Sequence, residues 1–266
     1  MMAAGSPRAA LRRAFASLPP VAFGAPPRAV LGCIQIPTDF VLDREGPKLI
    51  EGVPGVELRL QKLSMDSDAI AADTFERAAG SLGAAAAVLR PPERCTAVGL
   101  ACTSMAFTLG GARVDAELQR ACPAAATTDM ARAQVAALRA LGAQRVALLT
   151  PYVEALSAAN AATLEAEAGV AVRSRATMGL EVDAQTTAVT PACIAAWARA
   201  VDATDADVLV VGCSAFRACD YGFVDALEAD LGKPVVTSTQ AFLWAMLRAA
   251  GVEDRIPGYG ALLRRH

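Results

Sequence analysis

Residues 97–107 read AVGLACTSMAF, and residues 208–218 read VLVVGCSAFRA. Each stretch begins with an apolar run of strand length. A cysteine follows that run, and a hydroxyl residue follows the cysteine. Cys102 and Cys213 hold equivalent positions, 111 residues apart. The two stretches therefore predict two similar halves, each with a cysteine directly after a buried strand.

Two further matches support an internal duplication. Pro123 and Pro234 repeat the 111-residue offset of the cysteines. The first half opens on VLGCIQIPTDF (residues 30–40), and the second opens on RVALLTPYVEA (residues 145–155), so each half begins with an apolar strand. Several matches in the same order indicate a repeated structural unit.

Apolar runs of strand length alternate with longer helical patterns along the chain. Continuous apolar strands between helices are typical of a parallel sheet that is covered on both faces. The predicted strands are Ala29–Ile36, Val56–Leu60, Ala97–Ala101, Ala124–Thr128, Arg145–Thr150, Val170–Ser174, Val208–Gly212 and Val235–Ser238. The predicted helices are Ala69–Leu89, Asp115–Ala121, Met130–Leu141, Glu154–Ala168, Pro191–Val201, Val224–Leu231 and Ala241–Ala250.

These elements predict an α/β fold of two similar lobes, each with a parallel four-stranded sheet flanked by helices. Pseudo-two-fold symmetry would relate the lobes and bring equivalent loops face to face. We expect an N-terminal lobe over residues 29–142 and a C-terminal lobe over residues 143–240, with the active site between them. The C-terminal helix, within residues 241–266, is expected to pack back on the first lobe.

The composition argues against several functions. The formal net charge of −2 gives no electrostatic case for binding nucleic acid or an anionic membrane. No run reaches about 18 uninterrupted apolar residues, so no transmembrane helix is expected. The only histidine, His266, is the last residue, which argues against a triad built on imidazole. Because no CxxC pair occurs, we expect no metal site.

The first 28 residues form a distinct segment. They carry four arginines and no acid, and the first acidic residue is Asp39. This composition is typical of a disordered extension and also of an organellar targeting segment. Seven cysteines in a chain of 266 residues do not suggest a disulfide framework, which favours a reducing compartment. We expect a cytoplasmic protein, or an organellar one if residues 1–28 are a transit peptide.

Cys102 and Cys213 are the candidate catalytic residues. Ligands of parallel sheets bind beyond the carboxyl ends of the strands, where both cysteines lie. Oriented backbone amides there are expected to lower the thiol pKa. Two thiols that face one carbon could remove a proton from one side and deliver one to the other, or act as nucleophile and acid. The other five cysteines lack this context and are interpreted as small buried hydrophobes.

The chain resembles the aspartate/glutamate racemase superfamily, in the branch of maleate cis-trans isomerases, arylmalonate decarboxylases and ectoine-utilisation proteins. The resemblance covers residues 29–265. The segments that carry it are GCIQIPTDF, ACTSMAF, LLTPYVEAL, VVGCSAFR, GKPVVTSTQAFLWAMLRAAGV and PGYGALL. The resemblance implies an enzyme that needs no metal or organic cofactor and forms a homo-oligomer. Its substrate would be a small carboxylic acid.

The resemblance also implies roles for individual residues. Cys102 matches the cysteine with which maleate isomerases attack the substrate double bond, whereas arylmalonate decarboxylases typically have glycine there. Cys213 matches the proton-donating cysteine of both groups. Four residues match positions that bind a substrate carboxylate or stabilise an enediolate: Thr103, Ser104, Tyr152 and Ser214. For Tyr152 the alternative is an aromatic residue that only anchors the start of a helix.

The sequence departs from maleate isomerases at two positions. Asp39 and Asp183 stand where those enzymes have asparagines that bind a carboxylate. At 4 Å, two like charges repel each other by about 4 kcal/mol at an effective dielectric constant of 20. These two aspartates favour a substrate whose second end is cationic or neutral. Ectoine-utilisation proteins share the Thr38-Asp39 pattern, so that subgroup is the closest resemblance. The alternative for Asp39 is a residue that caps a helix beginning near Phe40.

Three functions follow from these features. The first is an isomerase or racemase without a cofactor that acts on a small carboxylic acid. The second is a lyase of the same superfamily, either a decarboxylase or an enzyme that cleaves dimethylsulfoniopropionate. The third is a small-molecule binding protein without catalysis, against which the intact thiol pair argues.

Overall fold

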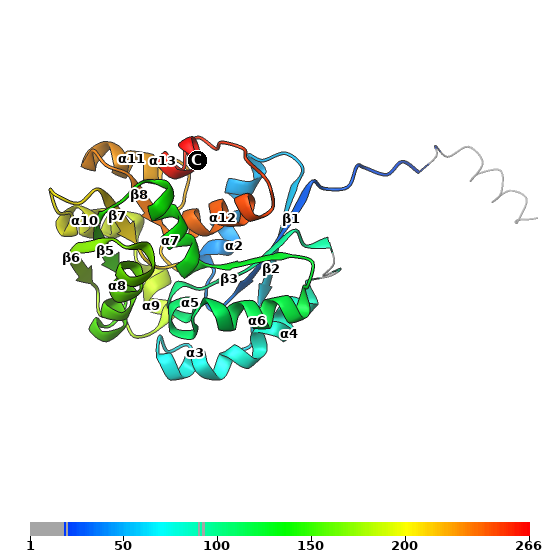
Figure 1. Cartoon of the computed structure of the whole chain (residues 1–266), viewed down its shortest axis with the longest axis horizontal. Helices are drawn as coiled ribbons and strands as arrows, with labels where there is room; N and C mark the ends of the chain where they lie inside the picture. Colours follow the sequence, from blue (N-terminus) through cyan, green and yellow to red (C-terminus); the bar gives the residue numbers. More distant parts are fainter. Residues whose placement is uncertain (1–18, 20, 90, 92–93) are drawn as a thin grey trace, which may run out of the picture.

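The computed structural model describes residues 19, 21–89, 91 and 94–266, and two parallel four-stranded sheets form its centre (Figure 1). The first sheet has the order β2-β1-β3-β4, and the second has the order β6-β5-β7-β8. The strands of the first sheet are β1 (Ala29–Gln35), β2 (Val56–Lys62), β3 (Ala97–Ala101) and β4 (Ala126–Asp129). Those of the second are β5 (Arg145–Thr150), β6 (Ala171–Thr177), β7 (Val208–Val211) and β8 (Val235–Thr237).

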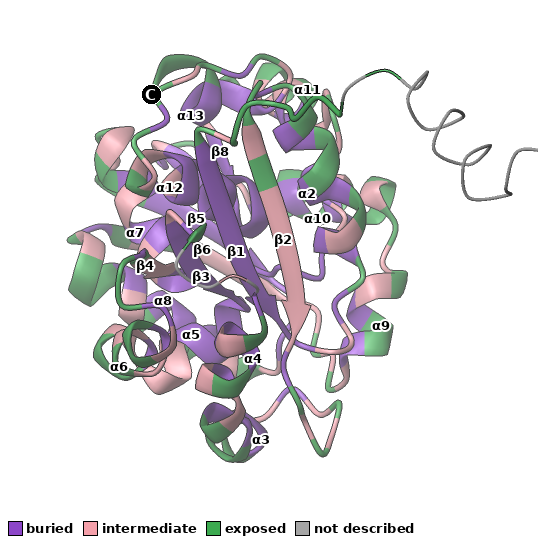
Figure 2. Cartoon of the chain, turned by 90° about the vertical axis from the view of Figure 1, so that its right-hand side faces the viewer, coloured by how far each residue is buried: buried purple, intermediate pink, exposed green. Residues whose placement is uncertain are grey.

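The strand orders confirm the predicted fold class, because each strand of one sheet has a counterpart at the same place in the other. The apolar strands β1 and β3 are buried along their whole length. The edge strand β2 alternates apolar with polar residues and is only partly covered (Figure 2). Central and edge strands therefore follow from the hydrophobic pattern of the sequence.

Helices cover both faces of the sheets. Those of the first half are α2 (Val41–Glu51), α3 (Ala72–Ala78), the 3-10 turn η1 (Ala79–Ser81), α4 (Leu82–Val88), α5 (Thr103–Leu109), α6 (Gly111–Ala121) and α7 (Met130–Ala140). Those of the second half are α8 (Glu154–Ala168), α9 (Asp183–Ala188), α10 (Pro191–Val201), α11 (Phe223–Leu231), α12 (Ser238–Ala249) and α13 (Gly260–Arg265).

One predicted helix, Ala69–Leu89, is wrong as a single element, because the chain forms α3, η1 and α4 there. The break lies at Gly80-Ser81, where glycine weakens a helix. The Ser81 hydroxyl donates to the carbonyl oxygens of Ala78 (2.8 Å) and Ser64 (2.9 Å), and such bonds compete with helical ones. The predicted helices also lack α2, α5, α9 and α13, although the capping alternative for Asp39 assumed a helix that begins near Phe40.

The equivalent helices α7 and α12 pack against each other at the centre of the molecule. Each begins directly after the last strand of its sheet and is capped by a side chain, Asp129 for α7 and Thr237 for α12. Helix α12 also packs on β3, where a Cβ atom on Gly99 would lie 2.6 Å from the Phe242 ring. Glycine at position 99 thus permits α12 to pack closely on the first sheet.

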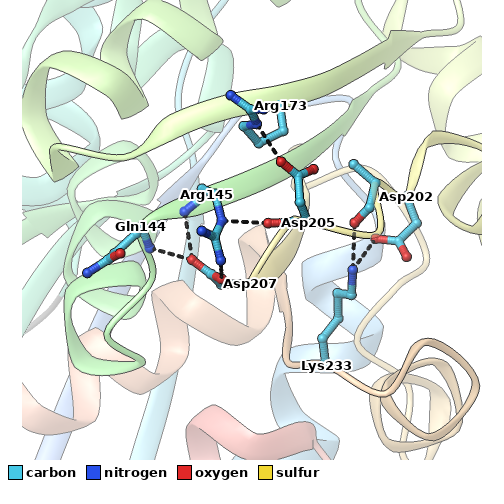
Figure 3. A network of polar contacts seen from close by, with 8 residues as sticks. Gln144, Arg145, Arg173, Asp202, Asp205, Asp207 and Lys233 are labelled. Carbon is cyan, nitrogen blue, oxygen red and sulfur yellow. Dashed lines mark hydrogen bonds and ion pairs between the residues drawn. The ribbon is translucent and has the colours of Figure 1, made fainter.

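Ion pairs close the edge of the second sheet at which its strands begin (Figure 3). Arg145, at the start of β5, bonds the Asp207 carboxylate at 2.6 Å, and Lys233, before β8, bonds Asp202 at 3.0 Å. Arg173 of β6 pairs with Asp205 at 2.8 Å. These charged groups pair with one another at the amino ends of the strands. The candidate catalytic residues lie at the opposite, carboxyl ends.

The predicted N-terminal extension lies mostly outside the described residues, since residues 1–18 and 20 are not described. Residues 21–27 form no helix or strand and run away from the body (Figure 1). The fold proper starts at Arg28, whose guanidinium pairs with Asp254 at 2.7 Å. Among the described residues, no helix has the length and apolar character that crossing a membrane requires.

Candidate active site

Cys102 lies between the end of β3 and the start of α5, and its side chain is buried. Its extended backbone, with φ −148° and ψ 115°, ends the strand before the helix begins. The Cys102 Sγ atom is 3.6 Å from the Ser104 hydroxyl oxygen. A thiol and a hydroxyl are thus held side by side at the carboxyl end of the first sheet.

Cys213 lies at the equivalent place in the second sheet. It follows β7 and Gly212, and its side chain is also buried. The carbonyl oxygen of Ser214 accepts a hydrogen bond from the Thr239 hydroxyl at 3.4 Å, which ties the segment after Cys213 to the start of α12. Both predicted cysteines therefore occupy the positions that the repeat indicated.

Tyr152 links the two thiols. It follows β5, is buried, and packs edge-to-face on Phe107 at a centroid distance of 6.1 Å. Burial raises the pKa of its phenol, and the charges of Cys213 and Cys102 raise it further. The hydroxyl has no hydrogen bond of good geometry to any described residue, although Ser104 and Cys213 are near enough to affect its pKa. Both cysteines and the phenol thus belong to one site.

The expectation of low thiol pKa values is wrong for both cysteines. Burial raises the pKa of Cys102 to about 12, and the charge of Asp183 raises it further. Burial and Asp183 also raise the pKa of Cys213 well above its usual value. Backbone amides of Met105 and Ala215 lower the two values, as the sequence indicated, but they do not compensate for desolvation. Both thiols are therefore protonated near neutral pH.

The effect of the Asp183 charge on the thiol pKa values can be tested by substitution. Burial raises its pKa to about 6, so above that pH its charge disfavours both thiolates. We expect Asp183→Asn to increase the rate of alkylation of Cys102 and Cys213 by iodoacetamide at pH 8, by up to about tenfold for one pKa unit. The difference should shrink below pH 6. Mass spectrometry of the alkylated peptides measures both rates.

The exposed Cys193 is the internal control for this experiment, because its alkylation should be equal in both proteins. Equal rates at Cys102 and Cys213 in the two proteins at pH 8 would contradict the proposed influence of Asp183 on the thiols.

Asp39 is fully buried beside the same site. Its Oδ1 atom accepts hydrogen bonds from the backbone amides of Val41 (2.9 Å) and Leu42 (3.2 Å) at the start of α2. The capping alternative is therefore present for one oxygen. The other oxygen, Oδ2, has no hydrogen-bond partner among the described residues. Burial raises the pKa of Asp39, while the Ser214 hydroxyl lowers it.

Asp183 is the first residue of α9 and lies on the second half of the chain. Its Oδ2 atom accepts a hydrogen bond from the Thr38 hydroxyl at 2.8 Å, which joins the two halves next to Asp39. The carboxyl is buried, and the charge of Asp39 contributes to its raised pKa. The structure thus brings both predicted aspartates to the thiol pair.

Thr103, Ser104 and Ser214 are buried around the cysteines but differ in where they point. The Thr103 hydroxyl donates to the Ser238 hydroxyl oxygen at 2.9 Å, so it joins α5 to α12. Ser104 contacts Cys102, and Ser214 lies close enough to Asp39 to lower its pKa. The part of these residues in substrate binding stays a prediction.

The sequence analysis missed three residues of this region. Thr38 was identified only as part of a sequence pair, although its hydroxyl holds Asp183. Lys62 ends β2, donates to the backbone oxygen of Asp39, and pairs with Asp43 at 2.7 Å. Glu45, in α2, is fully buried and accepts a hydrogen bond from the backbone amide of Cys219 at 2.9 Å. The position of Glu45 between Leu42 and Leu49, on the apolar face of a helix, could have indicated from the sequence that it is buried.

Within the part of the chain that the structure describes, no group of three or more His, Cys, Asp or Glu side chains could hold a metal ion. All seven cysteines are free thiols.

Two parallel-sheet lobes with a buried thiol at the carboxyl edge of each define an α/β protein with a two-cysteine site. The chain belongs to the arylmalonate decarboxylase family, since the model of that family matches residues 31–263. This finding confirms the predicted branch of the superfamily.

Individual relatives come from both activities of the family. A maleate isomerase of Nocardia farcinica is 27% identical over 243 residues, which cover 88% of this chain and 95% of that protein. An arylmalonate decarboxylase of Bordetella bronchiseptica is 34% identical over 137 residues, which cover 51% of this chain and 56% of that protein.

A solved structure supports the fold independently. It is a variant of the Nocardia farcinica maleate cis-trans isomerase with a covalently bound succinylcysteine intermediate. It superimposes with a TM-score of 0.81 over 90% of this chain and 99% of that one, at 24% sequence identity.

Proposed function

We propose that this chain is an isomerase without a cofactor that acts on a small carboxylic acid through Cys102 and Cys213. The observation that carries the proposal is the convergence of two buried free thiols, one from each sheet, on the Tyr152 phenol. The relatives support the reaction class, since a maleate isomerase is similar over most of the chain. The succinylcysteine in the solved isomerase shows that a cysteine of that protein bonds covalently to substrate carbon.

The two thiols would divide the reaction as nucleophile and acid. The Cys102 thiol first releases its proton to solvent as the substrate binds. The thiolate Sγ then forms a bond to one carbon of the substrate double bond, and the π electron pair of that bond moves to the other carbon and its carboxylate. The proton of Cys213 goes to the neighbouring carbon, and the reverse steps expel Cys102 after rotation about the new single bond. In the racemase version, one thiolate takes the α-proton and the other thiol returns one to the opposite face. Neither version consumes an oxidant, a reductant or water.

Tyr152 and the hydroxyls near the thiols would stabilise the charge that develops on the carboxylate. A neutral phenol is suited to this task, because its raised pKa keeps the proton on oxygen and the hydroxyl is not engaged by another described side chain. Hydrogen-bond donors that are already oriented in a buried site stabilise an enediolate without reorganisation.

A decarboxylase is the second candidate function, and the 34% identity with an arylmalonate decarboxylase favours it. The presence of Cys102 favours the isomerase, because decarboxylation followed by protonation needs only one thiol. Analysis of products by NMR separates the two. With a panel of unsaturated and α-substituted small acids, we expect a product of the same formula as the substrate. Release of carbon dioxide or of a volatile sulfide in step with turnover would instead establish a lyase.

Three finer predictions belong with this proposal. Seven free cysteines support a reducing compartment such as the cytoplasm. The family resemblance supports a homo-oligomer, which light scattering would measure. The Thr38-Asp39 pair supports a position near the ectoine-utilisation proteins within the family.

A further inference from the structure

We propose that Asp39 and Asp183 form a subsite for an ammonium group, so that the substrate is a small carboxylic acid that also carries an amine. This inference rests on the proposed function, because it concerns the second end of a molecule whose reacting carbon lies between the thiols. The carboxyls of Asp39 and Asp183 are buried and come from different halves of the chain. Both lie close enough to the two cysteines to raise the thiol pKa values.

The first observation is the free oxygen of Asp39. Two backbone amides satisfy its Oδ1 atom, but Oδ2 is buried and has no hydrogen-bond partner among the described residues. The Ser214 hydroxyl is near enough to affect the pKa of Asp39 without forming a hydrogen bond of good geometry. A buried acceptor without a donor is unfavourable, so a ligand that donates a hydrogen bond at this atom would be stabilised.

The second observation is the position of Asp183. Its Oδ2 atom accepts a hydrogen bond from the Thr38 hydroxyl at 2.8 Å, and Thr38 is the residue that precedes Asp39 in the chain. The Oδ1 atom of Asp183 can accept a further hydrogen bond. The two carboxyls repel each other, since the charge of Asp39 raises the pKa of Asp183. A cation shared between two carboxylates removes this repulsion.

The chain itself does not supply that cation. Neither carboxyl forms an ion pair with any described lysine or arginine, and the charge of Lys62 only lowers the pKa of Asp39. The Lys62 ammonium is engaged with Asp43 at 2.7 Å, with the backbone oxygen of Asp39, and with the Phe40 ring at 4.9 Å from its centroid. A ligand with a positive charge would therefore supply the compensation that the described lysines and arginines do not.

The Oδ2 atom of Asp39, which accepts no hydrogen bond from a described residue, favours an ammonium over cations that cannot donate a hydrogen bond. An ammonium donates hydrogen bonds, whereas a sulfonium or quaternary amine has no hydrogen to donate. A second carboxylate on the substrate would add a like charge to the pair. A bound ammonium would also offset the negative charge that disfavours the thiolates of Cys102 and Cys213, so substrate binding and thiol activation would be coupled.

Calorimetric titration with two matched probes tests the subsite. 3-Aminopropanoate and succinate are of similar length, but one ends in an ammonium where the other has a second carboxylate. We expect the wild-type protein to bind 3-aminopropanoate at least about tenfold more tightly than succinate. The double variant Asp39→Asn/Asp183→Asn should lose this preference and bind succinate at least as tightly.

The asparagine variants are suitable because they should fold. Asparagine caps a helix as well as aspartate does, and at position 183 its amide oxygen can still accept the Thr38 hydrogen bond. Equal or tighter binding of succinate by the wild-type protein would overturn the subsite, and so would a failure of both probes to bind or an unchanged preference in the double variant.

The two proposals fail separately. Turnover of dicarboxylates alone would remove the ammonium subsite and leave the isomerase. Selective binding of 3-aminopropanoate without turnover of any small amino acid would retain the subsite and remove the isomerase.

Discussion

Replacing Cys213 by serine should lower the turnover number by about 10² to 10⁴-fold, the range that a positioned general acid contributes. A serine hydroxyl has nearly the same shape as the thiol but is a far weaker acid, so proton delivery to the substrate should fail. Cys102→Ser should have an effect of similar size, because the hydroxyl is a poor nucleophile without an adjacent base. Steady-state kinetics on the substrate found by product analysis measures both effects.

The fold should survive both substitutions, which melting temperatures would establish. The matched control is Cys193→Ser, because Cys193 is exposed on α10 and should tolerate serine with full activity. Full activity in Cys213→Ser or Cys102→Ser would contradict the two-thiol mechanism. Loss of activity in Cys213→Ser alone would point to protonation without a nucleophile and thus to a decarboxylase.

Glu45 connects the two halves of the chain through the backbone of Cys219. Its Oε2 atom accepts the backbone N–H of Cys219 at 2.9 Å, in the segment between Cys213 and α11, and its Oε1 atom is buried without a partner among the described residues. Burial raises its pKa to about 8, and the charges of Asp220 and Asp39 add to this, while the Cys219 amide and Arg44 lower it.

The raised pKa predicts a loss of stability with rising pH. The folded protein holds the Glu45 proton more tightly than the unfolded chain does, so the free energy of unfolding falls as the pH rises from about 4.5 to about 8. Glu45→Gln removes this loss and keeps an acceptor for the Cys219 amide. We expect the variant to be more stable than the wild-type protein at pH 9 by on the order of 2–4 kcal/mol, and of similar stability at pH 4.

Urea unfolding at the two pH values measures this difference. Glu51→Gln is the matched control, because Glu51 is exposed at the end of the same helix and should leave stability unchanged at both pH values. A Glu45→Gln protein that is less stable than the wild type at pH 9 would show that the ionised carboxylate stabilises the junction between the halves.

The sequence predicted the sheets well because their signal is local. All eight strands were found, since each is a continuous or alternating apolar run between helices, and the repeat predicted their arrangement in two sheets. Short helices such as α5 and α9 were missed, because six or seven residues give too little periodicity for a pattern to be recognised.

The sequence predicted which side chains lie together at the candidate site but not their electrostatics. Cys102, Cys213, Tyr152, Asp39 and Asp183 come together as the repeat and the resemblance indicated. The thiol pKa could not be predicted, because neighbouring amides are visible in a sequence whereas burial and the approach of Asp183 are properties of the folded chain. Glu45 was missed for the same reason, since its partner Cys219 lies 174 residues away.

Deuterium incorporation during turnover in deuterated water tests the central claim most directly. If Cys213 delivers a proton to substrate carbon, NMR of the product should show solvent deuterium at one carbon with the wild-type protein. The same signal should disappear with Cys213→Ser at equal protein concentration. Incorporation at the wild-type rate in Cys213→Ser, or turnover by the wild-type protein without any deuterium in the product, would contradict a catalytic thiol pair.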